Sequence, residues 1–284
     1  MIRIALPNKG TLSEEAAVLV KAAGYNVRRD AKELSVLDAA NDVEFLFLRP
    51  RDIAVYVGKG IVELGITGRD LLQDSGVEAA ELLALGFGKS RFCYAVPKES
   101  TLTVEQLNGH RIASSYPNIV KTDMARRGFD CPVTKLDGAV EISIRLGVAD
   151  VIADVVESGS TMRQAGLKII GEPVMFSEAV IIARGADRAQ QPQIHTFLQR
   201  VQGILTARNY VVVEYDVPAA QLAAVCEITP GVESPTVSPL SKPEWYAVKS
   251  LVPRKDLNGI IDRLEEQGAR GIMVMDIRTC RMHA

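Results

Sequence analysis

The sequence lacks any long hydrophobic run. A membrane-spanning helix needs roughly 20 consecutive, predominantly apolar residues, and no stretch of the 284 residues approaches that length. The opening segment, MIRIALPNKG, also lacks the basic stretch, apolar core and small-residue cleavage site of a secretory signal. We therefore expect a cytoplasmic protein without a membrane partner, whose N-terminal residues form the first strand of the fold.

Metal-binding side chains are also scarce. Neither the cysteines nor the histidines fall at the short spacings of metal sites and redox motifs. We therefore predict reduced, mostly structural thiols. The protein ligands of any metal ion stay unknown at this point. The net charge of −2 argues against a nucleic-acid partner but is compatible with a small basic pocket for a phosphorylated ligand. The scattered residues are Cys93, Cys131, Cys226, Cys280, His110, His195 and His283.

The sequence does contain a regular alternation of short apolar runs and helix-like segments, which is typical of an α/β fold. One series includes the apolar segments IRIAL, VEFLFL and ELGITG, and a second series begins near Phe92. We predict a two-lobed core of periplasmic-binding-protein-like (type II) architecture, in which ligands bind beyond the carboxyl ends of the strands. The first lobe is predicted at residues 1–90 with a return segment at about 180–209, and the second lobe at residues 91–179.

The pattern changes at Tyr210. The apolar segments YVVVEYDV, WYAVKSLVP and GIMVMDI alternate with two helical segments, and a short strand is expected around SPTVSP. The resulting order, β-α-β-β-α-β, is that of a ferredoxin-like domain. We therefore predict a third domain at residues 210–284.

One loop in the second series has the residues of an anion site. The segment DVVESGST places an acid at the end of a predicted strand, followed by a turn rich in glycine and hydroxyl groups that leads into a helix. Backbone N–H groups of such a turn can hold a phosphate while the carboxylate binds vicinal hydroxyls, and a 5-phosphoribosyl group carries both features. An ordinary strand-to-helix cap would have a similar sequence. The loop residues are Asp154, Val155, Val156, Glu157, Ser158, Gly159, Ser160 and Thr161.

The longer segment around this loop resembles the signature of a known family. Residues 141–162, EISIRLGVADVIADVVESGSTM, are similar position for position to the signature segment of the ATP phosphoribosyltransferases. The segments ALPNKGTLSE, FLRPRDIAVYV, LGITGRDLL, LDGAVEIS and ITPGVESPTVSPL also resemble the long form of that family, which carries a regulatory domain of the ACT type. The matching signature positions are Glu141, Gly147, Asp154, Ser158, Gly159, Thr161 and Met162.

The resemblance implies an enzyme, a pentosyltransferase, that transfers the phosphoribosyl group of 5-phosphoribosyl-1-pyrophosphate to N1 of ATP in the first step of histidine biosynthesis. Mg²⁺, carried mainly by the substrate phosphates, is the expected cofactor. Such a transfer passes through a positively charged sugar, so it needs positioning and charge stabilisation more than a nucleophilic side chain. Asp154 would bind ribose hydroxyls, and Glu141 would assist it or favour the positive sugar, unless both are ordinary capping or surface acids. Glu157 is expected to contribute only its backbone.

Basic residues follow three predicted strands of the first lobe. Lys9, Arg49 and Arg69 each come directly after an apolar run, so we expect their loops at one edge of the sheet. Arginine suits a phosphate or a purine face, and lysine supplies a compact charge, although each residue alone could be an ordinary surface residue. The sequence does not decide which of them contacts ATP and which the donor pyrophosphate. The predicted ATP and pyrophosphate residues are Lys9, Gly10, Arg49, Arg69, Asp70 and Leu71.

For the third domain, the resemblance implies a sensor that binds histidine as a feedback inhibitor between neighbouring domains, with AMP as another inhibitor. Asp216 would accept a proton of the ligand, and Ser234 and Thr236 would hold its carboxylate, unless their segment is a plain turn. Sheet edges left open by such a domain favour a homo-oligomer, a dimer or a hexamer. The predicted histidine residues are Asp216, Val232, Ser234, Thr236 and Gly271.

Two other classes of protein share the predicted architecture. A non-catalytic small-molecule binding protein would also have two lobes around a cleft, because a fold does not fix a function. A non-catalytic regulatory subunit would retain the fold too, but it would not need the intact loop with both acids. The sequence favours the enzyme.

Overall fold

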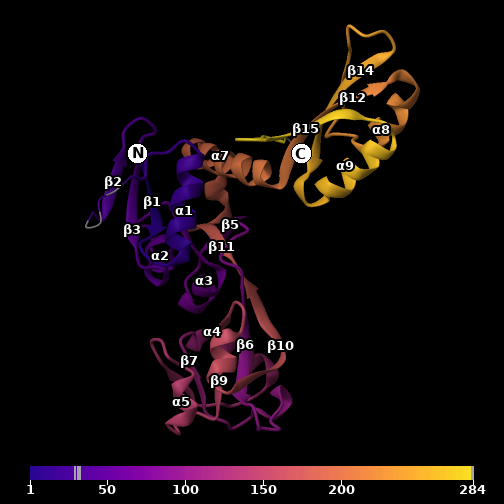
Figure 1. The fold of residues 1–284 in the computed structure, drawn as a ribbon. Coiled ribbons are helices and arrows are strands. Elements are labelled where there is room, and N and C mark those ends of the chain that lie inside the picture. The colour runs from indigo at the N-terminus through magenta and orange to yellow at the C-terminus, as the bar shows by residue number, and fades with distance from the viewer. Residues whose placement is uncertain (29, 31–32, 283–284) are drawn as a thin grey trace. The chain divides into compact units, whose positions relative to one another are not determined.

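The computed structural model describes residues 1–28, 30 and 33–282, which form three sheets (Figure 1). His283 therefore lies outside the described residues. Contacts divide the chain into two compact units, the first made of Met1–Lys21 and Tyr25–Thr196, and the second of Ala22–Gly24 and the chain from Phe197 onward. Among the described helices, none has both the length and the apolar composition that crossing a membrane requires.

The first sheet has six strands in the order β2-β3-β1-β4-β11-β5. Strand β1 (Ile2–Pro7) pairs in parallel with β3 (Val43–Leu48) on one side and with β4 (Leu64–Gly68) on the other. β1 and β4 are largely buried, as expected for parallel strands that are covered on both faces. Because the three strands run in the same direction, the loops after them lie at one edge. The helices that follow these strands are α1 (Thr11–Ala22), α2 (Pro50–Gly58) and α3 (Arg69–Ser75).

The chain leaves the first sheet and later returns to complete it. Strand β11 (Ala179–Ala183) is fully buried and lies between β4 and β5 (Ala80–Ala84), antiparallel to both. Strand β2 (Ser35–Asp38) pairs antiparallel with β3 and forms the opposite edge. The first sheet therefore combines segments that are separated in the chain by the whole of the second sheet.

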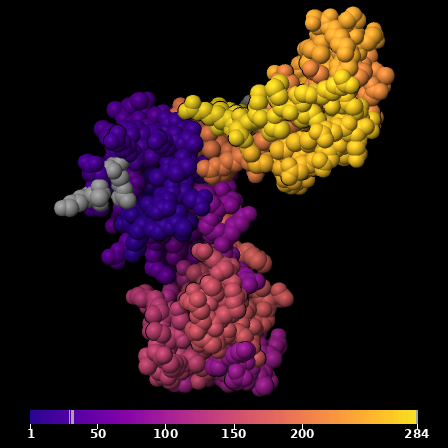
Figure 2. Space-filling model, viewed as in Figure 1, coloured from indigo at the N-terminus to yellow at the C-terminus, as the bar shows by residue number. Residues whose placement is uncertain are grey.

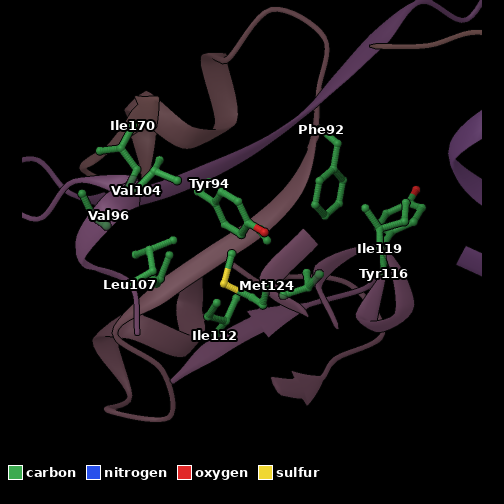
Figure 3. Packing of buried hydrophobic residues seen from close by; sticks show 13 residues of the cluster. Phe92, Tyr94, Val96, Val104, Leu107, Ile112, Tyr116, Ile119, Met124 and Ile170 are labelled. Atoms are coloured by element: carbon green, nitrogen blue, oxygen red, sulfur yellow. The ribbon is translucent and has the colours of Figure 1, made fainter. Parts of the chain in front are cut away.

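The second sheet has five strands in the order β10-β6-β9-β7-β8. Its middle strand, β9 (Val151–Val156), pairs antiparallel with β6 (Ser90–Pro97) and parallel with β7 (Ile112–Ser114). Figure 3 shows the buried cluster against this sheet, in which Phe92 and Tyr94 are fully buried. Because β9 pairs with a strand on each side, the position of its last residues, which lead into the predicted anion loop, is fixed by the sheet. The remaining elements are η1 (Val104–Gln106), α4 (Pro117–Arg127), β8 (Val133–Lys135), α5 (Ile142–Arg145), α6 (Ser160–Gln164) and β10 (Leu167–Ser177).

The third sheet, in the second unit, has four antiparallel strands in the order β13-β14-β12-β15. Alternate residues of β12 are buried against the two helices α8 and α9, which is the period of a strand with one covered face. Figure 2 shows in orange to yellow the surface that this part of the chain forms on the face in view. Its elements are β12 (Tyr210–Pro218), η3 (Ala219–Gln221), α8 (Leu222–Ile228), β13 (Thr236–Pro239), β14 (Trp245–Pro253), η4 (Arg254–Asp256), α9 (Leu257–Glu266) and β15 (Arg270–Asp276).

The predicted fold class is confirmed: two α/β sheets are followed by a ferredoxin-like β-α-β-β-α-β domain. Between β11 and β12 lie η2 (Ala186–Gln190) and the long helix α7 (Pro192–Asn209). The sequence did not reveal β10, because Gly171 and Pro173 interrupt its apolar pattern and the pairing register shifts between Ile170 and Met175. The other strands missed from the sequence are the short β2, β5 and β8.

Candidate active site

The predicted anion loop lies at the end of β9. Asp154 is within the strand, opposite Cys93 of β6, and the turn that follows ends at Gly159, whose φ of +72° is in the left-handed region. Helix α6 then begins at Ser160. The strand, turn and helix therefore occur in the predicted order. Because α6 is short, anion binding there depends on the turn's N–H groups and hydroxyls more than on a helix dipole.

A cavity of about 310 Å³ opens at this loop. Glu141, which directly precedes α5, lines this cavity together with the residues of the loop. The Ser158 and Ser160 hydroxyls lie 3.0 Å apart at its wall, so they can serve one bound group together. All of the predicted loop residues line the cavity: Asp154, Val155, Val156, Glu157, Ser158, Gly159, Ser160 and Thr161, with Met162 beside them.

Arg163 contributes a positive charge to the same loop. Its guanidinium Nη1 donates a hydrogen bond of 3.2 Å to the carbonyl oxygen of Ser158. The remaining donors of this exposed side chain are available for an anion beside the loop. The sequence contained a signal for this residue, because an arginine just after a Ser/Thr-rich turn is a common phosphate partner.

The Asp154 carboxyl is electrostatically unusual. Burial first of all, together with the negative charges of Glu141 and Asp70, raises its pKa from 3.8 to about 6. A hydrogen bond of 2.8 Å from the N–H of Val155 and the positive charge of Arg51 act in the opposite direction. A partly buried carboxylate with free lone pairs is suited to accept hydrogen bonds from ligand hydroxyls.

Tyr116 links the two sheets of the first unit at this point. Burial raises the pKa of its hydroxyl, and so do the charges of Asp70 and Asp154, which shows that the three side chains lie close together. Asp70 lies at the start of α3, after the third parallel strand of the first sheet. In Figure 3, Tyr116 is labelled beside Ile119 at the margin of the second sheet's core. Tyr116 and Asp70 therefore join the loop acid to the first sheet.

Arg51, like Arg163 and Tyr116, was not selected from the sequence. Its guanidinium donates to Asp74 at 2.6 Å and to the carbonyl oxygen of Ser115 at 2.8 Å, and it lies 4.9 Å from the ring centre of Tyr116. The first partner belongs to α3 and the other two precede α4, so these contacts become visible only in the folded chain. The only sequence signal was a second basic residue in the segment RPRD.

The three basic loops of the first sheet are placed as predicted at the ends of β1, β3 and β4. Lys9 and Arg49 have exposed side chains. Arg69, in contrast, donates from Nε and Nη2 to Glu81 at 2.8 and 2.7 Å, and from Nη2 to Glu178 at 3.3 Å. These contacts, first of all the hydrogen bond to Glu81, raise the pKa of Arg69. Its guanidinium is therefore already engaged by carboxylates.

The other predicted residues near these loops have mainly backbone or buried positions. Gly10 has a φ of +76°, in the left-handed region that favours glycine. Asp70 is buried, and its backbone N–H and carboxylate both bond to the hydroxyl of Ser177, at 3.0 and 2.7 Å. Leu71 packs against the core of the second sheet.

In the ferredoxin-like domain the predicted residues fall into two groups. Asp216 on β12 lies beside Gly271 on β15, where an added Cβ would come within 3.9 Å of a carboxylate oxygen. The other group is exposed: Val232 and Ser234 lie on the segment that leads into β13, and Thr236 is the first residue of that strand. Since β14 separates β13 from β12, the two groups are about 10 Å apart across the sheet. Within one copy the two groups therefore lie on opposite sides of β14.

No group of three or more histidine, cysteine, aspartate or glutamate side chains is arranged to hold a metal ion within residues 1–28, 30 and 33–282. The oxygen donors around the cavity are carboxylates and hydroxyls, which suit a hard cation such as Mg²⁺. These donors fit a cation that substrate phosphates bring with them.

Fold and site together define a two-lobed α/β protein with a cavity lined by carboxylates, hydroxyl groups and a glycine-containing turn. Comparison with known families makes this specific. The family model HisG, ATP phosphoribosyltransferase, matches residues 49–203, and the model of the HisG C-terminal domain matches residues 207–279. The chain belongs to the ATP phosphoribosyltransferase family, and it is an enzyme of the pentosyltransferase type.

Curated relatives match over nearly the whole chain. The chain is 55% identical to an ATP phosphoribosyltransferase of Salinibacter ruber over 99% of its own length and 100% of the relative. It is 52% identical to one of Mycobacterium tuberculosis with the same coverage. Among solved structures, the ATP phosphoribosyl transferase (HisG:HisZ) complex from Thermotoga maritima contains a chain with a TM-score of 0.64 and 24% identity, covering 72% of this chain and 99% of that one. This likeness supports the fold.

Proposed function

We propose that this chain transfers the phosphoribosyl group of 5-phosphoribosyl-1-pyrophosphate to N1 of ATP, releasing pyrophosphate, as the first step of histidine biosynthesis. The observation that carries the proposal is the cavity that unites Glu141, Asp154 and the turn at 157–161. It offers a carboxylate for ribose hydroxyls next to hydroxyls and backbone groups for a phosphate. The donor sugar phosphate has these two features side by side.

The residues around the cavity would act by positioning and by charge. Asp154 accepts hydrogen bonds from the ribose hydroxyls, while Ser158, Ser160 and Thr161 hold the 5-phosphate. Glu141 adds negative charge beside the sugar, which stabilises the positive charge that develops as the bond to pyrophosphate breaks. Mg²⁺ would neutralise part of the charge on the departing pyrophosphate, held mainly by the substrate phosphates.

The edge of the first sheet would hold the second set of phosphates. Lys9 and Arg49 are exposed there and are the best placed for ATP or the donor pyrophosphate, together with the backbone at Gly10. Asp70 and Leu71 would line the adenine side. Arg69 would have to exchange Glu81 for a phosphate before it could contribute.

The direct test of the reaction is an ultraviolet absorbance assay for the ring-modified adenine product after ATP, phosphoribosyl pyrophosphate and Mg²⁺ are mixed with the protein. Formation of product that requires both substrates supports the proposal. Binding of both without product would instead favour a small-molecule binding protein. The family membership already favours the enzyme over that alternative.

The raised pKa of Asp154 leads to a prediction about pH. Ionised Asp154 is the form that accepts hydroxyl bonds, so kcat/KM for the donor should fall as pH drops through about 6, by up to tenfold per unit below it. Raising the pH above that value restores the ionised form. The measurement is kcat/KM for the donor between about pH 5 and 8. A flat profile would exclude a requirement for the ionised Asp154.

We further propose a division into catalytic lobes at residues 1–90 with 180–209 and at 91–179, and a regulatory domain at 210–284. Histidine would inhibit through the regulatory domain, and AMP is proposed as a second inhibitor. A histidine held at the boundary between neighbouring copies of this domain would favour a homohexamer built from dimers. Exposed apolar side chains of this sheet, including Val237 and Met273, also suit such contacts. A cytoplasmic location fits this role.

The histidine site can be tested at Asp216. Asp216→Ala should raise the histidine concentration needed for half inhibition at least roughly tenfold, the effect of losing about 1.4 kcal/mol of binding free energy. Turnover without histidine should be little changed, because Asp216 lies in the second unit. Inhibition curves at matched substrate concentrations give the answer, and superimposable curves would place the sensing site elsewhere.

A further inference from the structure

Three buried hydroxyl groups form a connected network in the ferredoxin-like domain. Tyr215, Thr229 and Ser250 are 1%, 0% and 4% exposed. The Tyr215 hydroxyl lies 2.7 Å from Thr229 Oγ1, which donates to the carbonyl oxygen of Val225 at 3.1 Å. The Ser250 hydroxyl donates to the carbonyl oxygen of Thr229 at 2.8 Å. Thr229 is therefore held through both its side chain and its backbone.

The network fixes the point at which the chain leaves α8. Thr229 is the residue directly after that helix, and its N–H still bonds to Val225 at 3.0 Å. Two residues later, Gly231 has a φ of +71°, and a Cβ there would lie 3.2 Å from the Ser250 hydroxyl and equally close to the backbone of Ser234. Segment 230–236 therefore starts from a fixed residue and folds tightly over Ser250.

This segment carries half of the proposed effector site. It presents Val232, Ser234 and Thr236 to solvent, whereas Thr229 at its start is buried. The other end of the network is Tyr215, the direct neighbour of Asp216 on β12. Because side chains alternate along a strand, Tyr215 faces the helices while Asp216 faces the opposite side of the sheet. The network thus connects the strand of Asp216 to the start of the segment that carries Ser234.

We propose that Tyr215, Thr229 and Ser250 are positioning residues that set the affinity of the effector site. This inference rests on the proposed regulatory function of the domain. A hydrogen bond between buried groups is directional, and an incomplete buried network is costly. Hydrogen bonds to both the side chain and the carbonyl oxygen of Thr229 therefore define the position of segment 230–236 more sharply than apolar packing would. A variant that lacks one of these hydroxyls still fills the core, but it no longer holds segment 230–236 in one position.

The test compares variants of the full-length protein that remove single hydroxyls. Tyr215→Phe and Thr229→Val should each raise the dissociation constant of histidine, measured by calorimetry, about three- to tenfold, with kcat and KM unchanged in the absence of histidine. Thr229→Ser keeps the hydroxyl and should bind within about twofold of wild type. A three- to tenfold change corresponds to about 0.7 to 1.4 kcal/mol, which is the size of one lost hydrogen bond.

A variant of the apolar core shows whether an effect on histidine binding comes from the position of segment 230–236 or from the stability of the domain. Val211→Ala removes two methyl groups from the same buried cluster without touching the hydroxyls. It should lower the thermal midpoint but leave the histidine dissociation constant unchanged. Trp245, the single tryptophan of the chain, lies in this domain, so its fluorescence shows whether each variant is folded there.

The outcomes distinguish this inference from the proposed function. If Asp216→Ala weakens histidine binding while Tyr215→Phe and Thr229→Val bind like wild type, the network has no positioning role. Equal weakening by Val211→Ala would reduce its role to ordinary stability, which also overturns the inference. If wild type does not bind histidine at all, the regulatory function itself is wrong, and the inference is overturned with it.

Discussion

Asp154→Asn is expected to lower kcat/KM for the phosphoribosyl donor about 100-fold or more. An ionised carboxylate that accepts two hydroxyl bonds gains roughly 1.5 to 3 kcal/mol from each, and each 1.4 kcal/mol lost is a factor of ten. The asparagine side chain is nearly the same size and can still accept the 2.8 Å bond from Val155. Steady-state kinetics with varied donor concentration measure the effect.

Stability should not explain that loss. The folded-state pKa of Asp154, about 6, lies above its ordinary 3.8, so the ionised carboxylate costs stability as the pH rises through that window. At neutral pH the uncharged variant is therefore expected to be at least as stable as wild type. Glu157→Gln, which neutralises an exposed acid of the same loop, is the matched control and should change kcat/KM little. Equal kinetics in wild type and Asp154→Asn would remove Asp154 from the site.

Gly159→Val is expected to have an effect of similar size, a loss of roughly 100-fold in kcat/KM, because displacement of a binding loop by about 1 Å can cost that much. Gly159 is buried at a φ of +72°, where a β-branched residue is strained. A Cβ there would also lie 3.2 Å from the guanidinium of Arg163 and 3.6 Å from Val156. The turn must therefore shift, and its hydroxyls and N–H groups shift with it.

Gly166→Val provides the control for backbone strain. Gly166 has a φ of +71°, nearly that of Gly159, but a Cβ there meets no atom within 4 Å, and the residue does not line the cavity. Both variants should lose similar thermal stability, while only Gly159→Val should lose donor binding. Comparable losses of kcat/KM in the two variants would show that strain in general, and not the shape of the turn, limits activity.

The extent to which the sequence predicted the fold depended on how local the signals were. Strands β1, β3 and β4 are apolar runs bounded by clear turn residues, and the pairing order that places Lys9 and Arg49 at one edge follows from their parallel direction. Strand β10 carries Gly171 and Pro173 within a register shift, so no periodicity could reveal it. Short edge strands bury few side chains and leave an equally weak pattern.

The site shows the same contrast. The predicted anion loop is one contiguous segment, so its glycine and hydroxyl residues could be recognised from the sequence alone. All of its residues line one cavity. Arg51 and Tyr116 were missed because their roles come from contacts between segments distant in the chain. Arg69 shows the converse: its position after β4 was predicted, but its pairing with Glu81 and Glu178 depends on β5 and on the return of the chain before β11.

The insertion of β11 between β4 and β5 also dictates an order of events on the ribosome. Until residues 179–183 have been synthesised, β4 has an unpaired edge and β5 has no place in the sheet. The second sheet, in contrast, lies entirely within residues 90–177 and is complete earlier. At about 5 to 20 residues per second, translation of the intervening segment takes roughly 5 to 20 seconds. During that time the second lobe is being synthesised, while the apolar strands β1, β3 and β4 of the first lobe still await their last partner.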